Sequence, residues 1–388
     1  MRVALLPSAY HPSLGGVEEL TRRLAGELVA TGHGVQVWTS RRDGDSAATS
    51  DVVDGVQVQR FTFPMPRAAA VPLLRWPLQA ARVFSQLGEA VRSFRPDVLH
   101  VQCFSGNGVY AAALSTMTGI PLVVSLQGET VMDDRDIYEH SISLRGGLRF
   151  GLRRAARVTA CSQFALDDVL RRFGGDPRKS QVIFNGVALE EAGDEEPQDF
   201  PFPVFALAVG RVVQKKGFDL LLEAFALLTD LPDDCGLVIG GEGAELTSLQ
   251  AQAERLGLGD RVYFPGRLNR AQVAWAMRQA RCFVMPSRLE PFGIVVLEAW
   301  RAGTAVIASS IGGPPEFVED RVTGLLVDPH DTRRLAQALG SLLTDPTLAA
   351  NLGRAGRQRV EDLTWPKLAQ DYLAVYERAR ASRGRRLG

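Results

Sequence analysis

The sequence contains few of the residues used by metal sites, disulfide frameworks and histidine-based catalysis. Its 388 residues include only four cysteines and five histidines. No two cysteines have the C-x-x-C spacing of a zinc site, and no Ser/His/Asp set is readable from the sequence. We therefore expect reduced thiols and no zinc site.

Charge of one sign and long apolar runs are also lacking. Lys and Arg number 44 and Asp and Glu number 44, so the formal net charge is zero. A dedicated nucleic-acid binder is usually strongly basic, so we expect no nucleic-acid partner. No stretch approaches the 18 or so uninterrupted apolar residues of a membrane helix, and the first apolar run is too short for a signal peptide. A cytoplasmic location is the expectation.

Short apolar runs alternate with amphipathic segments along the whole chain. This alternation predicts an α/β fold of buried parallel strands with helices between them, in two doubly wound domains. The expected strands are residues 3–6, 34–39, 98–102, 122–125, 157–160 and 182–184, then 205–210, 236–240, 262–265, 282–286, 305–308 and 324–327. The acidic, Pro-rich residues 191–203 are the expected linker between domains 1–190 and 204–365. Residues 366–388 contain a last helix that we expect to pack back on the first domain.

Two glutamates flank a short turn in the second domain. Glu290 is followed by Pro291 and Gly293, which are both unfavourable inside a helix, and an apolar run then leads to Glu298. We predict Glu290 on a loop and Glu298 on the next helix, with both carboxylates reaching one site. The apolar neighbours of Glu298 predict burial, which favours a ligand hydroxyl as its partner. One helix-terminal and one exposed carboxylate are the alternative.

Two loops have the composition of phosphate sites. Gly15 and Gly16 open a helix after the first strand, where close approach and unpaired N–H groups suit an anion. The segment lacks G-x-G-x-x-G, so a dinucleotide cofactor is not expected. Arg211 and Lys216 lie on the loop after the first strand of the second domain, where they predict a diphosphate clamp. A plain turn and a solvated basic loop are the respective alternatives.

Two histidines are further candidates. His100 lies near the end of a predicted strand, where a buried and hydrogen-bonded side chain is the common outcome, and His11 lies in the loop before Gly15. The Gly-rich segment at residues 310–317 precedes a helix, and capping of that helix by Glu316 explains it at least as well as ligand contact. A turn explains residues 240–243.

Taken in order, these segments resemble the retaining glycosyltransferases of family 4, which have the GT-B fold of two Rossmann-like domains with an interdomain cleft. The resemblance covers the whole chain, and the spaced glutamates with their Pro-Phe-Gly turn are its most specific element. The segments that carry it are Gly15-Gly16, Asn185-Gly186-Val187, Gly210-Arg211 with Lys215-Lys216-Gly217, Glu290 through Glu298, and Gly312-Gly313-Pro314.

The resemblance implies a nucleotide-diphosphate sugar donor held mainly by the second domain. It also implies an acceptor hydroxyl of a glycan, a lipid-linked molecule or a small molecule, held mainly by the first. The implied donor contacts are Arg211 and Lys216 with the Gly15 and Gly16 amides on the diphosphate, Glu298 on the ribose, Glu290 beside the sugar, and the backbone of Phe292, Gly293 and Ile294 on sugar or phosphate.

The implied reaction retains the anomeric configuration and needs no metal or cofactor, because the departing phosphate oxygen takes the acceptor proton on the same face. Two positions depart from the family pattern. Gln127 stands where many relatives carry His, and Gln orients a substrate but cannot act as a base. Ala188 stands where relatives often carry Asp. Gln127, His100 and His11 are thus the residues expected to orient sugar or acceptor.

The sequence leaves the donor base, the sugar, the acceptor and the oligomeric state open. A peripheral contact with an anionic membrane on its inner face is one expectation, and an ordinary solvated helix surface is the alternative. The arginines behind it are Arg67, Arg75, Arg82, Arg145, Arg149, Arg153, Arg154 and Arg157. Other functions on the same fold are a sugar-nucleotide epimerase or hydrolase, and a catalytically silent nucleotide-sugar-binding protein.

Overall fold

Two separate α/β units make up the chain. The computed structural model describes residues 1–12, 15–41, 50–66, 70–133, 137–190, 195, 200–232 and 234–384. Unit 1 is Met1–Asn185 together with Trp365–Gly388, and unit 2 is Gly186–Thr364. The division follows Asn185, whereas residues 191–194 and 196–199 of the expected linker lie outside the described residues.

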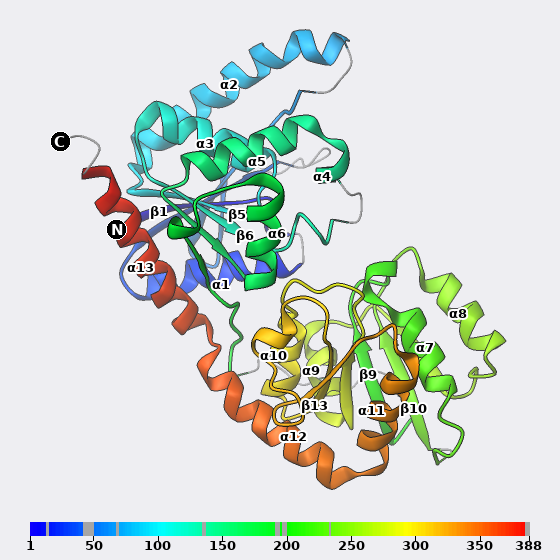
Figure 1. Ribbon diagram of the computed structural model, residues 1–388. Coiled ribbons are helices and arrows are strands. Elements are labelled where there is room, and N and C mark those ends of the chain that lie inside the picture. The colour runs from blue at the N-terminus through cyan, green and yellow to red at the C-terminus, as the bar shows by residue number, and fades with distance from the viewer. Residues whose placement is uncertain are drawn as a thin grey trace. The chain divides into compact units, whose positions relative to one another are not determined.

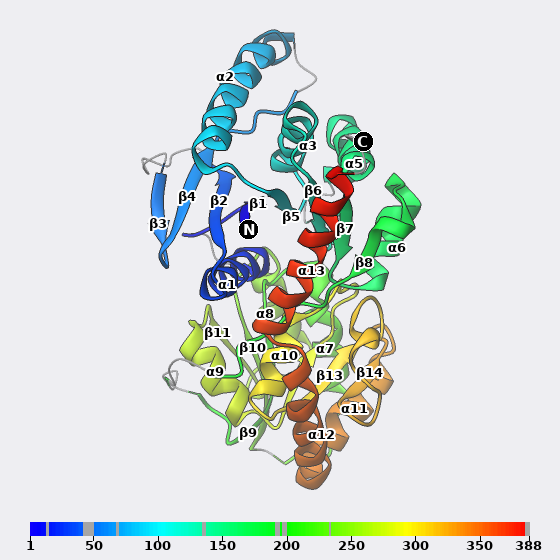
Figure 2. The same cartoon turned by 90° about the vertical axis from the view of Figure 1, so that its left-hand side faces the viewer.

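Unit 1 is built on an eight-stranded sheet in the order β3-β4-β2-β1-β5-β6-β7-β8 (Figure 2). Neighbouring strands run parallel, except that β3 and β4 form an antiparallel pair at one edge. The strands are β1 (Arg2–Pro7), β2 (Gly34–Ser40), β3 (Ser50–Val53), β4 (Val56–Phe61), β5 (Val98–Gln102), β6 (Leu122–Leu126), β7 (Arg157–Ala160) and β8 (Ser180–Val182).

Helices cover both faces of this sheet. The central strands are buried along nearly their whole length, as is typical of parallel sheets with helices on both sides. Helices α1 and α13 lie on one face, and α3 and α5 lie on the other (Figure 1). The helices of unit 1 are α1 (Gly16–Ala30), α2 (Ala70–Phe94), α3 (Gly106–Thr118), α4 (Ile137–His140), α5 (Ile142–Arg154), α6 (Gln163–Phe173), the 3-10 turn η1 (Pro177–Lys179) and α13 (Trp365–Gly384).

Unit 2 repeats the architecture with a six-stranded sheet in the order β11-β10-β9-β12-β13-β14, all parallel. Its strands are β9 (Val204–Val209), β10 (Cys235–Gly240), β11 (Val262–Gly266), β12 (Cys282–Met285), β13 (Ala305–Ser309) and β14 (Leu325–Val327). Its helices are α7 (Phe218–Ala226), α8 (Leu246–Arg255), α9 (Arg270–Gln279), α10 (Ile294–Arg301), α11 (Thr332–Thr344) and α12 (Pro346–Arg359), with 3-10 turns η2 (Gln214–Lys216), η3 (Pro314–Glu316) and η4 (Val360–Asp362). Alternate residues of β9, β10, β12 and β13 form one core with α7, α8 and α11.

The last helix of the chain belongs to unit 1. Helix α13 lies across β5, β6 and β7 (Figure 2). Leu368, Tyr372, Val375 and Ala379 recur every three or four positions and Tyr376 lies beside them, so they share one helix face, and all five are at most 2% exposed. Burying a large apolar side chain contributes about 1.5–3 kcal/mol, which makes this face sufficient to hold the helix.

A buried polar network lies beneath α13. His100 Nδ1 is 2.7 Å from the Tyr376 hydroxyl, and His100 Nε2 is 2.6 Å from Ser125 Oγ. Ser125 Oγ is also 2.5 Å from Thr159 Oγ1 and accepts a hydrogen bond from the Tyr372 hydroxyl at 3.1 Å. These contacts fix the position of α13, because apolar packing is non-directional and buried polar groups require their partners.

The α/β fold with two doubly wound parallel sheets confirms the expected fold class, and every expected strand has an observed counterpart. Three details differ. The β3–β4 pair was not predicted, because the predicted strands are continuous apolar runs. At this half-exposed sheet edge polar and apolar residues alternate instead. Strand β8 ends at Val182, where the expectation began. Helix α2 begins at Ala70 and includes Pro77, whereas the sequence pattern predicts a helix over residues 78–94 only.

The buried histidine makes stability depend on pH. Burial lowers the pKa of His100 from 6.5 to about 3, so the unfolded chain binds an extra proton between these values. Stability contributed by the neutral ring is complete above pH 6.5 and falls by about 1.4 kcal/mol for each pH unit below it. We expect the melting temperature of the wild type to drop more steeply from pH 7 to pH 5 than that of His100→Gln. Parallel slopes in thermal scans of the two proteins would contradict this assignment.

Candidate active site

The glutamate predicted on a loop is the centre of a polar cluster in unit 2. Glu290 lies between β12 and α10 and is only 7% exposed. Its Oε2 accepts a hydrogen bond from Lys216 Nζ at 2.6 Å and another from Ser287 Oγ at 3.1 Å. Glu298 lies on α10 as the Pro-Gly pattern predicts, but it is half-buried rather than fully buried.

The loop that carries the basic residues packs directly on the Glu290 loop. Gly217 ends η2 with a φ of +68°, and a Cβ at this position would overlap the carbonyl oxygen of Pro286. The Arg288 N–H donates to Lys215 O at 3.0 Å. This glycine is therefore required by both its left-handed backbone and the close approach. Lys216 is brought to Glu290 in this way, whereas the Arg211 side chain is exposed at the start of the same loop.

A third loop holds the main chain of Glu290. Gly313 N donates to Glu290 O at 2.8 Å, and Glu290 N donates to Ile311 O at 3.4 Å. Gly312, with a φ of +109°, lies where a Cβ would overlap the Glu290 carbonyl. The Gly-rich segment after β13 thus positions the glutamate through its backbone.

The turn between the two glutamates presents backbone groups to a ligand, because the Phe292 side chain is buried. The Phe292 ring is buried against Phe317, with ring centroids 4.6 Å apart. Gly293 has a φ of +96° and precedes Ile294, the first residue of α10. The first N–H groups of a helix generally lack partners one turn back, which makes the backbone at this helix start suited to contact an anion or a hydroxyl.

Sheet topology explains why these loops meet. In unit 2 the strand order reverses between β9 and β12, which are neighbours in the sheet although separate in sequence. In unit 1 the same reversal lies between β1 and β5. Open α/β sheets bind ligands at the carboxyl ends of strands at such switch points. The Lys216 and Glu290 loops follow β9 and β12, and the Gly15 loop follows β1.

An acidic side chain lies next to the glycine loop of unit 1, where the sequence predicts a phosphate site. Gly15 caps α1, and the residues at 13 and 14 lie outside those described. The Glu18 carboxylate stands where a Cβ on Gly15 would be, so an acidic side chain lies over the helix start. His11 is exposed in the same loop, and its carbonyl accepts a hydrogen bond from Arg60 Nη2 at 2.8 Å.

His100 requires a correction. Its side chain has no exposed surface, and both ring nitrogens are engaged by Tyr376 and Ser125 within the core of unit 1. Burial also keeps the ring neutral. We therefore assign His100 to the docking of α13 and withdraw it from the residues that orient a substrate.

Gln127 lies at the carboxyl end of β6, and both its side chain and its backbone are hydrogen-bonded within unit 1. Its Oε1 accepts a hydrogen bond from Asn185 Nδ2 at 3.2 Å. Its backbone N–H donates to Glu129 Oε2 at 2.7 Å, while Glu129 Oε1 accepts from Phe104 N at 2.6 Å. Burial raises the pKa of Glu129, and its backbone donors oppose that rise. Glu129 thus joins the loops after β5 and β6, a role that only its position two residues after Gln127 hints at.

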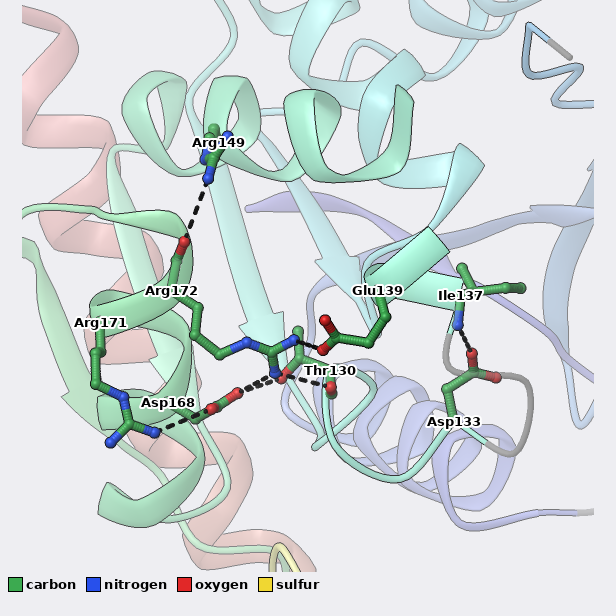
Figure 3. Close-up of polar contacts among 8 residues, drawn as sticks. All are labelled: Thr130, Asp133, Ile137, Glu139, Arg149, Asp168, Arg171 and Arg172. Atoms are coloured by element: carbon green, nitrogen blue, oxygen red, sulfur yellow. Dashed lines mark hydrogen bonds and ion pairs between the residues drawn. The ribbon is translucent and has the colours of Figure 1, made fainter. Parts of the chain in front are cut away.

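Helix α6 holds the segment that follows Gln127 (Figure 3). Arg172 Nη1 donates to the Thr130 carbonyl and to Asp168 Oδ2, both at 3.1 Å, and Arg172 Nη2 pairs with Glu139 of α4. Thr130 Oγ1 donates to the same Asp168 oxygen at 3.0 Å, and Arg171 pairs with Asp168 Oδ1. Buried Asp168 is therefore compensated by two arginines, and the start of the β6–α5 connection is tied to α6.

Three of the arginines expected at a membrane form hydrogen bonds within unit 1. Arg149, Arg154 and Arg157 donate hydrogen bonds to carbonyl groups of unit 1. Arg67 lies outside the described residues, as does the side chain of Arg75. The contact with an anionic membrane and the cytoplasmic location stay predictions.

Neither a metal cluster nor a membrane span was found in the part of the chain that the structure describes. Within those residues no group of three or more His, Cys, Asp or Glu side chains is arranged to hold a metal ion. None of the described helices combines the length and apolar character needed to cross a membrane.

Known proteins are similar to this chain in both sequence and fold. Residues 14–191 match the family described as Glycosyltransferase Family 4, and residues 194–359 match Glycosyl transferases group 1. D-inositol 3-phosphate glycosyltransferase of Streptomyces scabiei is 30% identical over 94% of this chain and 86% of its own length. Glycogen synthase of Mycobacterium tuberculosis is 29% identical over 100% of this chain and 96% of its own.

Two solved structures show the same fold. Sucrose-phosphate synthase from Thermosynechococcus elongatus matches with a TM-score of 0.79 at 23% identity, over 98% of this chain and 99% of that one. HepE from Anabaena in complex with UDP and glucose matches with a TM-score of 0.74 at 22% identity, over 96% and 98%. With two Rossmann-like units of the GT-B type, the chain belongs to glycosyltransferase family 4 and is a glycosyltransferase.

Proposed function

We propose that this glycosyltransferase takes its sugar from a nucleotide-diphosphate sugar and transfers it, with retention and without a metal, to a hydroxyl of a glycan, a lipid-linked molecule or a small molecule. The observation that carries the proposal is the contact of Lys216 with Glu290 at the switch point of unit 2. A fixed cation beside a buried carboxylate suits a substrate that presents a diphosphate next to a sugar.

In this proposal unit 2 holds the donor. Lys216 and Arg211 bind the diphosphate, and Glu298 binds the ribose hydroxyls from α10. Glu290 lies beside the donor sugar, and the backbone from Phe292 to Ile294 contacts sugar or phosphate. The α10 N-terminus and the exposed position of Arg211 support these roles. UDP and glucose are bound by Anabaena HepE, which favours a uridine donor here.

Unit 1 holds the acceptor in this proposal, with Gln127 and His11 as orienting residues, while the Gly15 and Gly16 amides assist in binding the donor diphosphate. Gln127 Nε2 and Asn185 Oδ1 are buried and have no protein partner among the described residues. One donor and one acceptor beside each other match a hydroxyl group, which both donates and accepts. Gln127 does not titrate at neutral pH, so it orients a substrate and carries no proton.

The proposed reaction is a same-face substitution. The bond between the anomeric carbon and the diphosphate oxygen breaks, and the acceptor oxygen bonds to that carbon on the same face. The departing phosphate oxygen takes the proton of the acceptor hydroxyl. Negative charge grows on the diphosphate, where Arg211 and Lys216 stabilise it. Positioning and electrostatics thus supply the catalysis, and neither a metal nor a titrating histidine enters.

The donor follows from a nucleotide-release assay. UDP-, GDP- and ADP-sugars are offered to the purified protein in EDTA, with and without a crude lipid and glycan extract. We expect release of one nucleotide that rises with the extract. Release without any dependence on extract indicates a hydrolase or epimerase instead, and tight nucleotide binding without release indicates a silent binder. Release that requires added Mg²⁺ contradicts metal independence.

Glu290 and Lys216 are expected to affect different steps. Glu290→Gln keeps the shape of the loop and removes only charge, so nucleotide affinity is retained while turnover falls by about 100-fold. Lys216→Ala is expected to lower turnover and, in addition, to weaken nucleotide binding. Lys215→Ala is the matched control in the same turn. Calorimetry with UDP, GDP and ADP, combined with release rates, separates the two effects. A Glu290→Gln enzyme with full turnover contradicts the role given to this carboxylate.

A further inference from the structure

An ion pair that sequence spacing does not reveal joins the two main loops of unit 2. Arg288 follows Ser287 in the loop after β12, and Asp219 lies in the first turn of α7. Arg288 Nη1 is 2.7 Å from Asp219 Oδ1, and Arg288 Nη2 is 2.6 Å from Asp219 Oδ2. Two parallel hydrogen bonds of this kind fix the relative orientation of the groups as well as their separation.

The same arginine also grips the backbone that precedes Lys216. Its Nη1 donates to Gln214 O at 2.7 Å, and its main-chain N–H donates to Lys215 O at 3.0 Å. Lys216 is the next residue, and its Nζ reaches Glu290 two positions beyond Arg288. The turn that presents Lys216 is therefore held by Arg288, which Asp219 anchors from the first turn of α7.

Electrostatics maintain the pair. Burial raises the pKa of Asp219, but the hydrogen bonds and charge of Arg288, together with backbone hydrogen bonds, lower that pKa overall. The Arg288 and Asp219 side chains keep 25% and 35% of their surface exposed. Pairs this accessible contribute little to the free energy of unfolding, so stability is a weak explanation for the arrangement. The placement of Lys216 is a better explanation for this ion pair.

We propose that Arg288 is a positioning residue for the transfer reaction: with Asp219, it holds the Gln214–Lys216 turn so that Lys216 stands where the donor diphosphate binds. The inference rests on the proposed function, since it takes Lys216 as a ligand of the diphosphate. Both terminal nitrogens of Arg288 are engaged within the protein. Arg288 therefore acts through Lys216 and not as a phosphate ligand itself.

The test measures nucleotide affinity by calorimetry on the full chain, with UDP as the probe and GDP and ADP in parallel. Arg288→Met is expected to weaken binding by about 10-fold, and Arg288→Lys by a similar factor because lysine keeps the charge but lacks the fork. Asp219→Asn keeps the shape of α7 and is expected to weaken binding in the same direction. Arg334→Met, which breaks the exposed Arg334–Asp331 pair of the same unit, is the matched control and leaves affinity unchanged.

The decisive comparison is made in the Lys216→Ala background. If Arg288 acts through Lys216, adding Arg288→Met to Lys216→Ala causes no further loss, whereas a merely structural role lowers affinity in both backgrounds. A further loss overturns the inference, as does wild-type affinity in both Arg288→Met and Asp219→Asn. Wild-type affinity in Lys216→Ala itself overturns the proposed clamp and this inference with it. Failure of the inference alone thus differs, because Lys216→Ala then still weakens binding.

Discussion

The close approach of two loops at the carboxyl edge of the second sheet is the constraint on which the candidate site depends. Gly217 must adopt a left-handed backbone and must lack a side chain, because the Pro286 carbonyl occupies the adjacent space. Only at this separation does Lys216 reach Glu290. Gly312 imposes the same condition on the loop after β13. Main-chain contacts therefore set the distance between the charged groups, so the charges are placed before any substrate arrives.

Unit 1 solves the equivalent problem with side chains. The loops after β5 and β6 are joined by a single carboxylate, Glu129, which accepts N–H groups from both. Arg172 then ties the continuing segment to α6 (Figure 3). Each of these hydrogen bonds and ion pairs can be removed singly by a substitution, and the others remain. A side chain on Gly217 or Gly312 would instead overlap a backbone carbonyl of the facing loop. The two units thus place their loops with different tolerance for change, and the loops of unit 2 are the more rigidly specified.

Sequence pattern predicted the parts of the molecule whose causes are local. Buried parallel strands are continuous apolar runs, and the Pro-Phe-Gly turn placed Glu290 on a loop and Glu298 on α10. Helix α5 was not predicted, because Gly147 and Gly151 lower helix propensity. Their reason is tertiary, since a Cβ on Gly147 would meet Val109 and one on Gly151 would meet the Phe104 ring. The Arg288–Asp219 pair was not predicted either, because no short spacing relates residues 69 positions apart.

The contact with Glu290 also explains how the charged Lys216 side chain is tolerated in a mostly buried position. Lys216 retains 18% of its side-chain surface and Glu290 retains 9%, so each charge has lost most of its hydration. An unpaired charge at that depth is costly, whereas a pair with a further donor, Ser287, is compensated. Under the proposed reaction the diphosphate replaces part of that compensation for Lys216, and the carboxylate is left facing the sugar. In that proposal the same ion pair stabilises the loop geometry and provides opposite charges at the two ends of the bond that breaks.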